Sequence, residues 1–233
     1  MTSKHKAFFL VMCAVFLVAV SVLGTLAYLT DKDTVTNTFT VGSVGLELDE
    51  ADVKTDGSYE TNHDDRVKAN EYHLLPGHTY YKDPTVTVEA GSEDAYVRMI
   101  VKVENIDQLK RALPNEGDTA KYYAEDEVFL LQMLCVNEKR ECTWNPDIWQ
   151  IVDDAEAQKK GIYEFRYKEV VEKSETKTVL PDLFTHITVP GEINNEHLEY
   201  LKDVKIVVNA HAIQADGFEK ADEAWEAFGN PSV

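Results

Sequence analysis

Hydrophobic and polar residues alternate along several stretches of the chain, which is the pattern of β-strands with one buried face. The clearest stretch is 95–104, where apolar residues occupy every second position from Val97 to Val103. A denser apolar run over 204–215, VKIVVNAHAIQA, predicts a further central strand. Alternation predicts three more strands, within 44–48, 80–89 and 161–171.

Helical spacing is confined to two short segments. Residues 106–113 are predicted to form a short helix, and 218–228 a closing helix, because the apolar residues of the second segment recur every three or four positions. Segments 128–136 and 144–152 are predicted to pair as a hairpin. Residues 47–66 are polar and acidic and predict a long exposed loop.

Together these elements predict the fold class. About eight strands at irregular spacing, with few helices and no internal repeat, are typical of an antiparallel β-sandwich. The prediction is therefore a mainly β protein with a few short helices and a C-terminal helix.

The first 27 residues have the three parts of a secretory signal peptide. Lys4 and Lys6 precede an uncharged apolar run over 7–23, and the small residues Thr25 and Ala27 flank Leu26. Cleavage after Ala27 would leave Tyr28 as the first residue of the mature chain. The alternative is an uncleaved membrane anchor, for which a run of about 17 residues is at the lower limit.

Charge narrows the possible partners of the exported chain. The whole chain has 42 acidic and 23 basic residues, a net charge of −19. Removing 1–27 removes two lysines and no acid, so residues 28–233 have 21 basic residues and a net charge of −21. This single predicted domain would repel nucleic acid and anionic membranes. Membrane contact is expected only before cleavage.

An acidic chain can also bind cations. An EF-hand beginning at Asp52 is excluded, because Lys54 stands at its third position and His63 at its twelfth. Calcium held by irregular loop carboxylates remains an open alternative, and no other cofactor is indicated.

Two cysteines remain after the signal peptide, Cys135 and Cys142, and an even pair in an exported protein predicts a disulfide. The alternative is a pair of reduced thiols.

Familiar catalytic patterns are missing from the sequence. There is no H-E-x-x-H, no G-x-S-x-G and no glycine-rich phosphate loop. The segment 196–199, EHLE, is interpreted as a solvated helix face, and His211 as a hydrogen-bonded strand histidine. No catalytic residue is assigned, and the chain is not expected to be an enzyme.

Longer segments resemble a known family. The sequence GTLAYLTD at 24–31, followed by TNTFTVG at 36–42, resembles the exported proteins of Gram-positive bacteria that a SipW-type signal peptidase processes. TasA, a fibre protein of the biofilm matrix, and the camelysins belong to this family. The similarity continues in LLPGHTYYKDPTVTVEAGSEDAYVRMIVKVEN at 74–105 and over 207–225.

The resemblance implies a jelly-roll-like sandwich secreted to the cell surface or matrix. It also implies self-association into fibres, in which the N-terminal segment of one subunit adds as a strand to the next. Here the donor would be 28–41, with Leu29, Val35 and Phe39 as the side chains that enter the neighbour and Val41 as its last residue. Its alternative is an ordinary first strand of the same domain.

Two other functions stay open. One is a secreted camelysin-like metalloprotease, although no zinc signature is present. The other is a surface adhesin or ligand-binding module that uses exposed loops such as 47–66.

Overall fold

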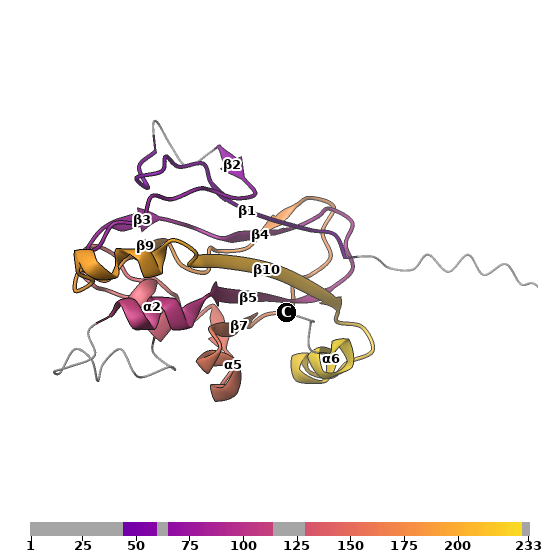
Figure 1. Ribbon diagram of the computed structural model, residues 1–233. Helices are drawn as coiled ribbons and strands as arrows, with labels where there is room; N and C mark the ends of the chain where they lie inside the picture. Colours follow the sequence, from indigo (N-terminus) through magenta and orange to yellow (C-terminus); the bar gives the residue numbers. More distant parts are fainter. Residues whose placement is uncertain (1–43, 60–64, 114–128, 230–233) are drawn as a thin grey trace, which may run out of the picture. The chain divides into compact units, whose positions relative to one another are not determined.

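Ten strands dominate the part of the chain that this computed structural model describes, residues 44–59, 65–113 and 129–229 (Figure 1). They form two four-stranded sheets and one two-stranded sheet, and every pairing is antiparallel. The helices are few and short. The prediction of a mainly β protein is confirmed.

The first sheet has the strand order β2-β1-β4-β8. Its strands are β1 (Leu46–Ala51), β2 (Arg66–Val67), β4 (Thr85–Val88) and β8 (Thr178–Val179). In its register Leu46 faces Val88 and Leu48 faces Val86, so apolar residues of neighbouring strands share one face.

Strand β1 corrects one prediction. The exposed loop predicted for 47–66 is wrong over its first residues, because the strand continues to Ala51 and both Glu50 and Ala51 are buried. A glutamate in a polar stretch predicts an exposed position. Here Glu50 is buried because Lys82 pairs with its carboxylate inside the protein.

The second sheet has the order β10-β5-β7-β6. It consists of β5 (Ala95–Glu104), β6 (Trp149–Ile151), β7 (Ile162–Tyr167) and β10 (Lys205–Gln214). Strands β5 and β10 are paired over their whole length, from Lys205 opposite Glu104 to Gln214 opposite Ala95. The alternation in β5 sends Val97, Met99, Val101 and Val103 into the core, where each is at most 1% exposed.

The remaining elements are short. Strands β3 (Thr79–Tyr81) and β9 (His186–Thr188) form the small sheet. Helices α2 (Ile106–Ala112) and α6 (Ala221–Phe228) lie within the two segments predicted to be helical. Between them along the chain are α5 (Ala155–Lys159) and the 3-10 helix η2 (Asn195–Leu201).

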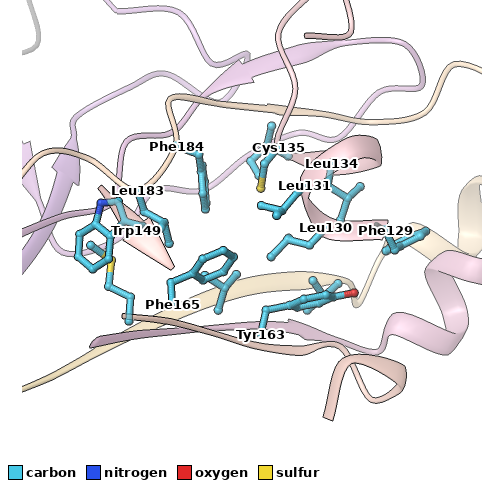
Figure 2. Packing of buried hydrophobic residues seen from close by; sticks show 14 of the residues in the cluster. Phe129, Leu130, Leu131, Leu134, Cys135, Trp149, Tyr163, Phe165, Leu183 and Phe184 are labelled. Carbon is cyan, nitrogen blue, oxygen red and sulfur yellow. The ribbon is translucent and has the colours of Figure 1, made fainter. Parts of the chain in front are cut away.

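One hydrophobic cluster joins both four-stranded sheets. A single turn of π-helix, η1 (Phe129–Leu134), supplies part of it, and Figure 2 shows Leu130 and Leu131 above Tyr163 and Phe165 of β7. The strand predicted for 128–136 is therefore wrong. A short unbroken apolar run has no distinct period, so it fits a buried strand and a buried helical turn equally well.

The predicted hairpin between 128–136 and 144–152 is reduced to one isolated bridge, in which Val136 pairs with Cys142. In that register Cys135 is paired with Thr143, whose N–H donates to the Cys135 carbonyl oxygen at 3.1 Å. Cys135 lies in a bend directly before this bridge, and no bond joins its sulfur to that of Cys142.

The predicted disulfide is accordingly not formed in this structure, where both thiols are free. Cys135 is buried in the core, and Cys142 is exposed.

Candidate binding groove

A groove of about 620 Å³ runs between the first and second sheets. One wall is formed by Leu48–Glu50 of β1 together with the connection Lys68–Tyr72, and the other wall by Lys205–Val208 of β10. Its apolar lining comes from several elements of the core and includes Leu109, Leu134, Ile187, Val189 and Leu201. A volume of this size is typical of sites that bind a ligand or a peptide segment.

Strand β10 forms one wall of the groove and lies at the edge of its sheet within the described residues. The sequence predicts a central strand here, and this prediction is wrong for the part of the chain that the structure describes. The apolar run VKIVVNAHAI is nevertheless typical of a strand with neighbours on both sides. Strand β10 therefore has the apolar composition of a central strand but, among the described strands, the position of an edge strand.

The free edge of β10 presents a regular series of backbone groups. Ala215 donates its N–H to Asp94 O at 2.6 Å. Hydrogen-bonded pairs alternate along an antiparallel ladder, so in the register of β10 and β5 the odd-numbered residues of β10 are those that bond β5. The odd-numbered residues of β5 accordingly bond on the side away from β10, where Val103 donates its N–H to Gly161 O at 2.7 Å. The even-numbered residues of β10 therefore direct N–H and C=O groups away from β5.

No backbone hydrogen bond from those even-numbered residues to another segment is found within the described ranges. Their side chains, from Ile206, Val208, Ala210 and Ala212, face the core but are only half-buried. Their partners on β5 are almost completely buried. Among the described residues, the side of β10 next to the groove thus lacks both the hydrogen-bond partners and the cover that an added strand would supply.

The β1 wall carries a buried ion pair. The Lys82 ammonium contacts the Glu50 carboxylate, and their side chains are 10% and 7% exposed. The other Glu50 oxygen accepts from Asn70, from its N–H at 3.0 Å and its Nδ2 at 2.9 Å. Buried charges at this position are tolerated because each one has a partner.

A second ion pair network joins β2 to the residues before β4. The Arg66 guanidinium bonds the carboxylates of Asp49 at 2.9 Å and Asp83 at 2.5 Å, and Asp83 also accepts from Ala51 N–H at 2.7 Å. These bonds fix the short strand β2 against β1.

Tyrosines beside these carboxylates have perturbed acidities. Burial, with Glu50 and Asp83 nearby, raises the pKa of Tyr72, which lines the groove. Burial, with Asp83 and Asp182, raises the pKa of Tyr81 to about 12. Both hydroxyls stay protonated at neutral pH and act as hydrogen-bond donors: Tyr72 Oη donates to Tyr81 O at 3.1 Å.

The groove combines an apolar interior with backbone groups of β10 that have no partner in the part of the chain that the structure describes. Such a surface binds an extended segment, because backbone hydrogen bonds supply affinity while alternate side chains fill the interior. Its lining includes Lys68, Lys202 and Lys205 as well as the acidic residues Asp49 and Glu71. The roles of Glu50, Lys82 and the β10 edge could not be predicted from the sequence pattern, since they depend on partners far away in the chain.

Most residues assigned from the sequence lie outside the described part. These are the cleavage residues Thr25, Leu26, Ala27 and Tyr28 and the donor residues Leu29, Val35, Phe39 and Val41. Among the described residues, no helix is long and apolar enough to cross a membrane.

The remaining candidates from the sequence have structural positions. Residues 196–199 fall within η2, and His211 lies in β10, where its Nδ1 is buried and has no hydrogen-bond partner among the described residues. The predicted hydrogen bond of His211 is therefore not made by Nδ1. Within 44–59, 65–113 and 129–229, no group of three His, Cys, Asp or Glu side chains could hold a metal ion.

Comparison with known proteins adds no relative. No protein-family model, no curated protein and no solved structure matches the chain.

Proposed function

We propose that the protein is an exported structural subunit of an extracellular matrix, and that one subunit joins the next by adding a strand to β10. The observation that carries this proposal is that β10 has the composition of a central strand but, among the described strands, occupies an edge beside an apolar groove. Its even-numbered residues offer the hydrogen-bonding groups, and the groove offers space for side chains.

The donor in this proposal is the segment 28–41 of a neighbouring copy. It is rich in threonine and valine, and residues 35, 37, 39 and 41 would fall on one face of an extended strand: Val35, Asn37, Phe39 and Val41. Cleavage after Ala27 by a SipW-type peptidase would free this segment. The precursor would then be unable to assemble before export.

The sheets are proposed to form a jelly-roll-like sandwich that the added strand completes. The half-buried core side chains of β10 support this arrangement. The resemblance to TasA and the camelysins supports the same reading of export and matrix localisation. The function proposed is structural, with no catalytic step.

The proposal is tested by blocking the β10 edge with Ala210→Pro. The Ala210 N–H points away from β5, so proline removes a donor from the free edge and leaves the β5–β10 hydrogen bonds intact. The purified mature variant is expected to lose polymers in electron microscopy and light scattering. The matched control is Asn209→Ala, at an exposed position on the other face, which should polymerise normally.

Thermal unfolding of each variant separates a blocked edge from a damaged fold. If Ala210→Pro unfolds, Val208→Lys provides the second test, because it places a charge in the groove. Polymers formed at the normal rate by a folded edge variant would refute strand addition at β10.

Deleting 28–41 tests the donor. A monomer that stays folded but no longer polymerises supports exchange between copies. A monomer that loses stability shows instead that 28–41 is the first strand of its own domain.

A further inference from the structure

Helix α6 is an acidic segment that lies on the outer face of the second sheet. In β5 and β10 this face carries the residues that alternate with the core positions, including Arg98 and the His211 opposite it. Helix α6 and the turn before it, 216–229, contain one lysine and five acidic residues, Asp216, Glu219, Asp222, Glu223 and Glu226. Helix α6 packs against β10 (Figure 1). The sheet next to it carries Arg98 and Arg166 together with Glu164.

Arg98 is the centre of this contact and its side chain is 1% exposed. Its guanidinium carbon lies 4.4 Å from the ring centroid of Trp225 and 5.1 Å from that of Phe228. Its Nη2 donates to the Gly229 carbonyl oxygen at 3.3 Å, at the C-terminal end of the helix where a cation is favoured. On the neighbouring strand, Arg166 forms an ion pair with Asp222 of the helix.

The same contact leaves several polar atoms unsatisfied. Buried nitrogens without a hydrogen-bond partner among the described residues include Arg98 Nε, Trp225 Nε1 and His211 Nδ1, all beneath this helix. The Arg98 contact with Glu164 is long, at 3.4 Å. Each unpartnered buried group opposes docking of the helix.

The helix itself has little intrinsic stability. It has eight residues, no side-chain hydrogen bond at its N-cap, and a terminal Phe228 that is 43% exposed. An isolated helix of this length is marginal in water, so its order depends on the contact with Arg98. Opening α6 exposes Trp225 and Ala224, which are 3% and 0% exposed, and rehydrates three nitrogens. An identical contact with a second copy recovers the loss of the Trp225 contact.

We propose that the outer face around Arg98 is a docking surface for an acidic helix that carries Trp and Phe three positions apart, and that its partner is α6 of a second copy. The α6 of one copy fits the face of another because the contacts are identical to those inside one chain. Residues 215–220, which join β10 to α6, form the hinge of this exchange. The surface lies on the opposite face of β10 from the groove and does not depend on strand addition.

Complementation between two full-length variants tests this exchange. Arg98→Ala retains the helix and damages the face, whereas Trp225→Ala retains the face and releases the helix. Each variant is prepared in one portion with a donor and in another with an acceptor fluorophore, so that energy transfer is measured within each variant as well as in the mixture. Both variants also contain Ala210→Pro so that the β10 edge does not contribute. The mixture is expected to give energy transfer at least ~10-fold above that within either variant alone, because only the mixture combines an intact helix with an open face.

Several controls keep the result interpretable. Thermal unfolding verifies that both variants are folded. If Trp225→Ala is unfolded, Phe228→Ala replaces it, and if Arg98→Ala is unfolded, Arg98→Lys replaces it. Lysine keeps the charge but loses the planar stacking on Trp225. An excess of unlabelled Arg98→Ala chain should abolish the transfer.

Energy transfer in the mixture no greater than in each folded variant alone would overturn the exchange. Transfer that persists when both chains lack Trp225 would overturn α6 as the partner. Polymerisation of the wild-type chain is scored separately, so failure here leaves the proposal for β10 untouched.

Discussion

At the scale of single residues, the most consequential feature is a charged pair placed inside the fold. Glu50 lies in β1 and Lys82 lies in the connection between β3 and β4. Both are almost fully buried. A buried pair adds little net stability compared with apolar residues, but removing one partner is costly because it leaves an uncompensated charge.

Replacing Lys82 with methionine should therefore destabilise the protein by about 3–5 kcal/mol in urea unfolding. The double variant Glu50→Gln/Lys82→Met should recover part of that loss, since a neutral amide can still accept from Asn70. The control is Lys159→Ala in an exposed pair with Glu156, for which little change in unfolding is expected. Equal losses at the two sites would contradict the importance of burial.

Cys135 gives a pH-dependent prediction. Burial, with the neighbouring Cys142, raises the pKa of the Cys135 thiol, so the folded state resists its ionisation. The unfolded chain ionises at about pH 8.5, and the free energy of unfolding should fall as pH rises above that value. Cys135→Ala should flatten this alkaline decline, whereas Cys142→Ala should retain most of it.

The same two cysteines can be titrated chemically. With an aromatic disulfide reagent, Cys142 should react in the folded protein and Cys135 only after unfolding, because one is exposed and the other is in the core. If neither thiol reacts in denaturant without a reductant, the disulfide predicted from the sequence is present in the protein studied.

At the scale of elements, one turn sets the pairing of β7 with β5. Gly161 has a φ of +79°, and a Cβ added there would lie 2.6 Å from the Val103 carbonyl oxygen and 3.1 Å from Ile106. Only glycine permits the backbone of residue 161 to lie this close to Val103. At the same place Val103 donates its N–H to the Gly161 carbonyl oxygen.

Gly161→Ala should consequently lower the free energy of unfolding for two reasons: the strain of a positive φ and the clash of the added Cβ with Val103. Gly91 provides a matched control, because its φ is +75° and no atom lies within 4 Å of an added Cβ. Gly91→Ala should cost about 1–2 kcal/mol from strain alone, and Gly161→Ala should exceed it by about 1–3 kcal/mol from overpacking. Thermal unfolding of the two variants measures this difference, and equal shifts would show that the clash is relieved.

Elements with a clear local period could be predicted from the sequence. Strand β5 has the bounds expected from its alternation, and β10, α2 and α6 lie within their expected segments. The π-turn at 129–134 was missed because an unbroken apolar run has no period. The groove could not be predicted, because it depends on which strands are neighbours and which edge stays open.

At the scale of the whole molecule, the dominant property is negative charge. Residues 28–233 contain 42 acidic and 21 basic residues, so copies of the chain cleaved as proposed after Ala27 would have a net charge of −21 and repel one another. The contact proposed at β10 consists of backbone hydrogen bonds and apolar side chains, which salt does not weaken. Repulsion should therefore set the rate at which copies meet, and strand addition should set the stability of the polymer.

Assembly of the mature protein should accelerate when NaCl is raised from about 10 mM to 150 mM, because the Debye length falls from roughly 30 Å to 8 Å. Light scattering gives the rate, and the Ala210→Pro variant should remain unassembled throughout. A rate that falls with salt would show instead that ion pairs drive assembly. CaCl₂ at equal ionic strength distinguishes screening from binding: screening gives a comparable acceleration, whereas a much larger one requires calcium bridging carboxylates of adjacent copies.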